Sequence, residues 1–457
     1  MIQSKPKAIA HRVRLENMPC VFPNAAGLDI GSTEIVAALP PDRDGETVRT
    51  FTTFTVELKQ LVVWLQGHRV DTVAMESTGI YWIPIFEMLE DVGIRVYLVN
   101  ARHFRIVPGR KSDYNDAQWL QKLHSLGLLE GSFRPDDEIC VLRSLLRHRA
   151  QLIEHRAPHI LHMQKALKLM NIQLPEVLSD VTGVTGMAIL RAIIAGERRG
   201  EVLAKLRRKE CKKSEHDIVE ALSGTWREEH LFVLQQSLEL FDYYTTKITE
   251  CDTRIDLQFS AMRPRFLVET DAPGHATGRT KKSKSKNKPA YDARAHLLRV
   301  LGIDLTEVTG ISDSIAQTII CEVGTDMSRF PTDRHFCSWL GLAPHNDISG
   351  GKILRSRTIK AHNRAAQAFR HAAQACARSY SAFGAFFRHI RARRGAQQAI
   401  VATAHKIARV FYHLLKYQEA FRPESMHEFD WKRRQRELKN LERRAKALGY
   451  SLQSAVG

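Results

Sequence analysis

Three short apolar segments near the start of the chain constrain its fold more than any other feature. They are AGLDIGSTEIVAAL at 26–39, VDTVAMEST at 70–78 and VGIRVYLVN at 92–100. Each has the length and composition of a buried strand, and the glycine turn inside the first predicts two strands there. The stretch YWIPIFEMLEDVG at 81–93 predicts a crossover helix. Strands that alternate with helices indicate an α/β sheet that is covered on its faces.

The remainder of the chain predicts helices. RSLLRHRAQLIEHRAPHILHMQKALKLM and SLELFDYYTTKITECDTRIDLQF place apolar residues at three- and four-residue spacing, which indicates a long helical hairpin or a coiled coil. GRTKKSKSKNK has no acid and no large apolar residue, so it predicts a flexible linker or an RNA-binding segment. The expected organisation is a flexible basic arm (1–24), an α/β domain (25–135), a helical or coiled-coil region (136–270), a linker (271–292), a mostly α domain (293–420) and a charged C-terminal helix (421–457).

A weak internal similarity links two helical segments. VTGVTGMAILRAIIAG at 181–196 and VTGISDSIAQTIICEVG at 308–324 both place a glycine turn before an apolar helix. Such turns can offer backbone N–H groups to a phosphate. A plain helix-packing role explains the pattern equally well.

The net charge points to a polyanionic partner. The 457 residues carry a formal charge of +18, with a pI of about 9.7. Residues 348–418 contain fourteen Lys or Arg and neither Asp nor Glu. A solvated surface normally mixes both signs, so this segment predicts contact with nucleic acid phosphates.

Other protein classes are disfavoured by what the sequence lacks. The seven cysteines are scattered, without the close pairs that a structural zinc site needs, which fits a reducing cytoplasm. No run of about 18 apolar residues predicts a membrane span. We expect a cytoplasmic protein that is associated with the nucleoid and makes no membrane contact.

Four carboxylates stand where the predicted elements can bring them together. Asp29 lies at the end of the first strand and Glu76 near the end of the second, while Asp113 and Asp116 lie in RKSDYNDAQWLQKLH at the start of a predicted helix. A spacing of three puts the last two on one helix face. Such a cluster suits two hard divalent cations, Mg²⁺ or Mn²⁺, that clamp the oxygens of a phosphodiester.

Each carboxylate also has a simpler explanation. Asp113 and Asp116 would favour a helix N-terminus behind Ser112 as its cap, and Asp29 could be a turn residue or part of a phosphate loop. Glu76 is harder to explain away, because carboxylates at the end of apolar strands are seldom buried unless they are paired.

The segment PHNDISGGKILRSRTIK, at 344–360, contains the candidate nucleophile. Ser349 precedes two glycines that let a backbone approach phosphate closely. A serine here could attack a phosphodiester and hold the DNA end covalently, although it needs an activator such as a metal, Asp347 or a nearby base. A surface glycine turn is the simpler alternative. Residues expected to contact nucleic acid are Lys111, Lys352, Arg355, Arg357, Lys360 and Arg364.

The ordered set of motifs resembles the insertion-sequence transposases that have a DEDD carboxylate tetrad and a C-terminal serine domain, some of which are bridge-RNA-guided recombinases. The resemblance runs through GLDIGSTEIVAA, VAMESTGIYWIP, PGRKSDYNDAQWLQKLH, WLGLAPHNDISGGK and ATAHKIARVFYHLLKY. Two departures are the length of the chain and His362, where many members carry glycine.

The resemblance implies a RuvC-like domain of the ribonuclease H fold, then a coiled coil, then a mostly α transposase domain. It assigns Asp29, Glu76, Asp113 and Asp116 to catalysis and to metal binding, and Ser349 to nucleophilic attack through a 5′-phosphoserine link. The implied partners are donor DNA, target DNA, a structured guide RNA and further copies of the chain in a dimer or tetramer.

Three alternatives remain at this stage. A RuvC-like nuclease would hydrolyse DNA with water and leave Ser349 structural. A non-enzymatic nucleic-acid binder would carry structural carboxylates. A sugar-kinase-like ATPase is suggested by DIGST alone and lacks the other motifs that such a fold needs.

Overall fold

The computed structural model describes residues 18–43, 45–77, 79–99, 116–264, 286–358 and 363–453. Lys111, Asp113, Lys360, His362 and residues 271–285 of the expected linker therefore lie outside the described residues. The chain divides into two compact units, Met1–Arg134 and Pro135–Gly457, which are treated separately below.

A five-stranded sheet forms the centre of the first unit. Its strands are β1 (Ala25–Ile30), β2 (Glu34–Ala38), β3 (Val48–Thr52), β4 (Thr72–Glu76) and β5 (Arg95–Val99), in the order β3-β2-β1-β4-β5. The first three pair antiparallel, whereas β4 runs parallel to both β1 and β5. This mixed sheet is consistent with the expected ribonuclease H-like fold.

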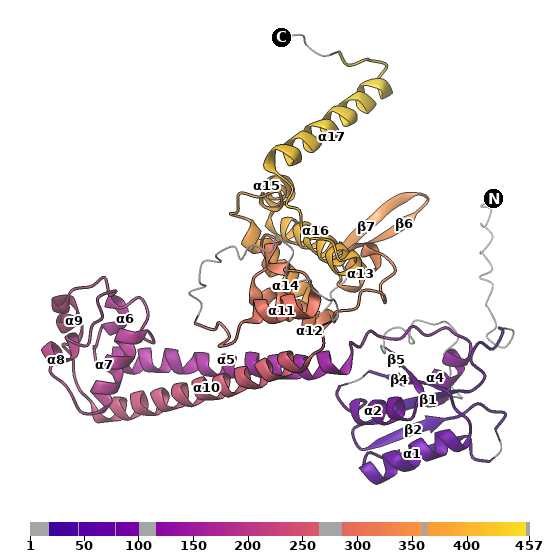
Figure 1. Cartoon of the computed structure of the whole chain (residues 1–457), viewed down its shortest axis with the longest axis horizontal. Coiled ribbons are helices and arrows are strands. Elements are labelled where there is room, and N and C mark those ends of the chain that lie inside the picture. Colours follow the sequence, from indigo (N-terminus) through magenta and orange to yellow (C-terminus); the bar gives the residue numbers. More distant parts are fainter. Residues whose placement is uncertain are drawn as a thin grey trace, which may run out of the picture. The chain divides into compact units, whose positions relative to one another are not determined.

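Helices cover both faces of this sheet, as the sequence predicts (Figure 1). On one face, α1 (Thr55–Gly67) and α2 (Ile83–Asp91) bury leucines and isoleucines against a core that includes Leu28, Ile35 and Met75. On the other face, α4 (Asp116–Ser125) packs Trp119, Leu120 and Leu123 against a smaller core with Ala74 and Val99.

A long antiparallel helical hairpin begins the second unit. It consists of α5 (Asp137–Leu169) and α10 (Glu228–Ala261), whose cross-contacts run in opposite directions along the two helices. A hairpin is therefore confirmed. Between its arms, the short helices α6 (Leu174–Val177), α7 (Val184–Ile194), α8 (Gly200–Ala204) and α9 (Glu215–Ala221) build a lobe with its own apolar core (Figure 1).

A buried ion pair joins the two arms to the described end of the expected linker. The Arg149 guanidinium on α5 contacts the Asp252 carboxylate on α10, and both side chains are almost wholly buried. Asp252 also accepts the backbone N–H of Ala290 at 3.0 Å, while Arg149 donates to the Asn287 carbonyl at 3.2 Å. These bonds satisfy charges whose burial would otherwise be costly.

The C-terminal part is helical around an aromatic core. Phe336, Phe369, Phe411 and Tyr412 are fully buried and stack on one another. The elements are α11 (Ala293–Leu301), η2 (Leu305–Glu307), α12 (Asp313–Val323), α13 (Asp333–Trp339), α14 (Arg364–Cys376), α15 (Ala382–Arg394), α16 (Ala396–Tyr417) and α17 (Met426–Ala447).

The glycine of the second repeat segment serves packing in this structure. Gly310 adopts a φ of +98°, and a Cβ there would lie 2.4 Å from the Ala372 carbonyl oxygen and 2.5 Å from the Cys376 sulfur. The turn before α12 therefore presses against α14. This close contact is the helix-packing role that the sequence offers as one explanation of the pattern.

A two-stranded hairpin interrupts the helices, where the sequence predicts only a mostly α domain. It joins β6 (Pro344–Ser349) to β7 (Lys352–Thr358). Gly350 and Gly351 both have positive φ, at 55° and 76°, which is the conformation of a tight two-residue turn whose twist suits paired strands. Among the described helices, none is long and apolar enough to cross a membrane.

Candidate active site

The end of β1 and the end of β4 bring two of the expected carboxylates together. The parallel register pairs Leu28 with Met75, so Asp29 and Glu76 are the next residues on adjacent strands. Leu28 and Met75 both point into the core beneath α1 and α2. Because successive side chains alternate between faces, Asp29 and Glu76 belong to the opposite face, which α4 covers.

Gly27 allows α4 to approach this face at backbone distance. A Cβ at Gly27 would lie 2.2 Å from the Ala117 carbonyl oxygen and 2.4 Å from the Gln121 backbone nitrogen. Only glycine leaves room for that approach. As a result, the first turn of α4, which begins with Asp116, lies beside the end of β1.

Buried hydrogen bonds fix the helix in this position. Gln121 donates its side-chain N–H to the Ala25 carbonyl at 3.1 Å, and His124 Nε2 lies 2.9 Å from Thr72 Oγ1. The His124 ring also packs on Phe22 and Tyr97. One helix is thus tied to both β1 and β4, the two strands that carry Asp29 and Glu76.

The electrostatics show that three carboxylates share one environment. The pKa of Asp29 is raised above its usual value, first by burial and then by the negative charges of Asp116 and Glu76. Like charges raise a carboxyl pKa only when they are close and poorly screened. Asp29 therefore lies within electrostatic reach of Glu76 and Asp116, while Asp113 lies outside the described residues.

The donor set suits a hard divalent cation. It contains carboxylate oxygens and no sulfur or imidazole, which is the chemistry that Mg²⁺ and Mn²⁺ prefer. Within the described ranges, no group of three or more His, Cys, Asp or Glu side chains is close enough to hold a metal ion. The metal-binding role that the sequence predicts for Asp29, Glu76, Asp113 and Asp116 therefore stays a prediction.

Ser349 lies at the tip of the exposed β6–β7 hairpin (Figure 1). It pairs with Lys352 across the turn, and every residue of β7 is exposed. Within the described part of the chain, the Ser349 hydroxyl has no hydrogen-bond partner, so the structure shows no activating base beside it. The glycine turn is indeed at the surface, which is also what the simpler interpretation predicts.

Of the expected nucleic-acid contacts, Lys352, Arg355 and Arg357 lie on β7, and Arg364 opens α14. Arg355 is opposite Asp347 in the strand register, and Arg357 is opposite His345. The seven-residue strand β7 therefore carries three exposed cations, and their contact with nucleic acid stays a prediction.

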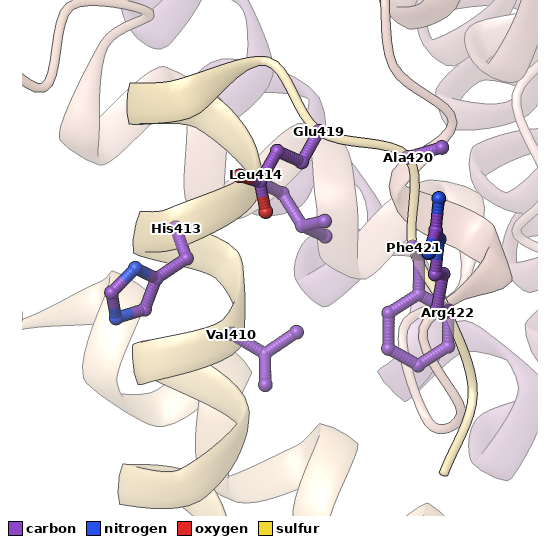
Figure 2. A pocket seen from close by; sticks show the side chains of 7 residues that line it. All are labelled: Val410, His413, Leu414, Glu419, Ala420, Phe421 and Arg422. Carbon is purple, nitrogen blue, oxygen red and sulfur yellow. The ribbon is translucent and has the colours of Figure 1, made fainter.

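A hollow of about 600 Å³ lies elsewhere in the second unit (Figure 2). Its wall combines Val410, His413 and Leu414 of α16 with the segment 419–422, which supplies Phe421 and Arg422. None of the predicted catalytic residues lines it. The hollow therefore adds no residue to the predicted catalytic set.

The residues that sequence reasoning missed are those that position α4. Gly27, Thr72, Gln121 and His124 all lie inside segments that were recognised, but their roles depend on contacts across the sheet. A glycine inside an apolar strand was the available signal, because it marks close backbone approach.

Comparisons with known proteins agree with this geometry. A family model for DEDD transposases of the IS110 type, described as a transposase, matches residues 26–172. A second model, described as transposase IS116/IS110/IS902 family, matches residues 304–388. A "Probable family 20 transposase" of Pseudomonas aeruginosa is 31% identical over 129 residues, which are 26% of this chain and 36% of that protein. The aligned part thus spans about a third of the relative's length.

Replacing Gly27 with alanine tests the close approach of α4. We expect Gly27→Ala to lower the free energy of unfolding by about 1–3 kcal/mol or more, because the new methyl group meets backbone atoms that cannot move aside. Gly67→Ala, at the end of α1 with open space around it, is the matched control and should be neutral or slightly stabilising. Chemical denaturation of the two variants would measure this; equal stabilities would refute the account.

His124 gives the first unit a pH dependence of known sign. Burial lowers its pKa from 6.5 to about 4, so between these values the unfolded chain binds a proton that the folded chain excludes. Above pH 6.5, His124 is neutral in both the folded and the unfolded chain and costs no stability. As the pH falls from 6.5 toward 4, the free energy of unfolding decreases by up to about 3 kcal/mol. Denaturation at pH 7 and pH 5 should show a smaller loss for His124→Gln than for the wild type. An unchanged loss would exclude His124 as its source.

Proposed function

We propose that this chain, which carries an IS110-type DEDD transposase domain and a second transposase domain, cuts and rejoins DNA during the movement of an insertion sequence. The observation that carries the proposal is the shared environment of Asp29, Glu76 and Asp116 at one edge of the sheet. Crowded carboxylates are destabilising unless they bind cations or move protons. Cutting a DNA phosphodiester requires both cation binding and proton transfer at such a site.

The carboxylates would hold Mg²⁺ or Mn²⁺, which when bound neutralises the charge that develops on the phosphodiester oxygens. Without a metal, burial and the charges of Asp116 and Glu76 raise the pKa of Asp29, so a bound cation would relieve the repulsion between these carboxylates. Gly27 and the buried bonds of α4 keep Asp116 in place while this happens.

Ser349 is the proposed nucleophile. Its oxygen would form a bond to the phosphorus, the bond from phosphorus to the 3′-oxygen would break, and that oxygen would leave as a 3′-hydroxyl after taking up a proton. The DNA end is then held as a 5′-phosphoserine, and attack by another 3′-hydroxyl rejoins the strands and restores the serine. The exposed hairpin tip supports this role, because an unobstructed hydroxyl can reach a phosphate between Lys352 and Arg355.

The proposed partners are donor DNA, target DNA and a structured guide RNA. The acid-free segment at 348–418 supports binding to a phosphate backbone. If a guide pairs with DNA, the protein needs few base contacts of its own. We further propose that the protein works in the cytoplasm on nucleoid DNA, as a dimer or tetramer.

A water-using nuclease is the second candidate, and one observation favours it. Ser349 has no activating base among the described residues, and a serine hydroxyl is a weak nucleophile when unassisted. In that case water would attack the phosphodiester beside the carboxylates and Ser349 would be only a turn residue.

Ser349→Ala separates these two functions. Incubated with Mg²⁺, co-purifying RNA and end-labelled junction DNA, the wild type should form a protein–DNA adduct that survives denaturation. The variant should form none, and strand transfer should fall at least about 10³-fold, because a covalent nucleophile has no substitute. Ser356→Ala, on exposed β7 of the same hairpin, should behave like the wild type. Magnesium-dependent cleavage without adduct in all three proteins would favour the nuclease instead.

A further inference from the structure

The helix α17 carries an apolar stripe that the rest of the structure leaves exposed. Trp431, Leu438, Leu441 and Leu448 are 57%, 43%, 50% and 74% exposed. Such large apolar side chains on an otherwise charged helix indicate an interaction surface.

Contacts among the described residues hold the beginning of α17 against the preceding part of the chain. Ser425 and Glu428 form reciprocal capping bonds of 2.9 and 3.1 Å, and Phe429 is buried beneath the Lys406 ammonium, 5.3 Å from the ring centre. Glu424 accepts hydrogen bonds from Lys406 and from Lys432. After this first turn, α17 continues as one helix to Ala447 (Figure 1). The side chains of Trp431, Leu438 and Leu441, and of Leu448 directly after the helix, are exposed.

The stripe has the spacing of a coiled-coil seam. Its four members are separated by intervals of seven, three and seven residues, and Arg434 and Ala445 occupy the positions between them, which gives the a/d pattern of a heptad repeat. We define this α17 seam by the residues Trp431, Arg434, Leu438, Leu441, Ala445 and Leu448. A seam of this kind buries itself against another helix with the same repeat.

Charge decides which helix fits and in which direction. In a parallel pair of two α17 seams, Arg434 would face Arg434 of the second copy, and Glu437 would lie beside Glu442 of the second copy. Both contacts join like charges, which is unfavourable when they are partly buried.

An antiparallel pair removes both conflicts. Leu438 then packs against Leu441 of the second copy, and Trp431 packs against Leu448 of the second copy. Arg434 lies across from the small side chain of Ala445, over which its aliphatic stem can extend into solvent. Glu437 comes to lie beside Arg444 of the second copy, and symmetry repeats this ion pair on the same flank, on the other side of the two-fold axis.

We propose that α17 is a self-association helix, which pairs antiparallel with α17 of a second copy of this chain. The pairing buries the exposed seam and forms two symmetric Glu437–Arg444 contacts. The two copies are then joined by a contact that requires neither DNA binding nor DNA cleavage.

The first test removes the seam from the full chain. Sedimentation of nuclease-treated Leu438→Asp/Leu441→Asp protein should show weaker self-association than the wild type over a wide concentration range. Asn440→Asp/Ala447→Asp adds the same charge on the outward side of α17 and should sediment like the wild type. Circular dichroism would confirm that both variants keep their helices. Equal sedimentation of the seam variant and the wild type would overturn the proposal, as would association that nuclease treatment abolishes.

Charge reversal tests the direction of the pair. In the antiparallel arrangement, Glu437→Arg and Arg444→Glu should each weaken association by about fivefold at low salt, and the double reversal should restore it. A parallel pair predicts the opposite sign for Glu437→Arg, because arginine would then lie beside Glu442 of the second copy. Stronger association of Glu437→Arg would therefore refute the antiparallel pairing.

Discussion

The close contact between Gly27 of β1 and the first turn of α4 is the constraint on which the candidate site depends. Because Gly27 has no side chain, the backbones of β1 and α4 come into direct contact. The first turn of α4 therefore lies at the edge of the sheet where the parallel strands β1 and β4 end. Gln121 and His124 then fasten the same helix to the strands. The carboxylates are therefore positioned by rigid elements rather than by flexible loops, which is what precise catalytic geometry requires.

In this arrangement, repulsion between carboxylates raises the free energy of the folded first unit. Asp29 is partly buried beside two other acids, so folding works against their repulsion. The same α4 contact buries a histidine that must stay neutral. Proteins accept such costs where function needs them, because ligand binding can repay them. The second unit presents the opposite charge on an exposed hairpin, and an anionic DNA backbone is attracted to it.

The sequence predicts the parts whose signals are local. Strands β1, β2, β4 and β5, helix α2 and the long hairpin follow from apolar periodicity, and the fold class from their order. The edge strand β3 was missed because Phe51 is its only buried residue. The β6–β7 hairpin was missed because its residues are exposed and lack an inward face, although two adjacent glycines mark the turn. The roles of Gly27 and His124 arise from contacts across the sheet, which no local pattern encodes.

Thermal unfolding of the wild type and Asp29→Asn, with and without Mg²⁺, tests the central claim most directly. Because its raised pKa makes ionised Asp29 a cost to folding at neutral pH, the metal-free variant should be more stable than the metal-free wild type. Mg²⁺ should stabilise the wild type and leave the variant nearly unchanged, without reference to activity. If the variant were less stable without metal and responded equally to Mg²⁺, the three carboxylates would not form a metal-binding catalytic cluster.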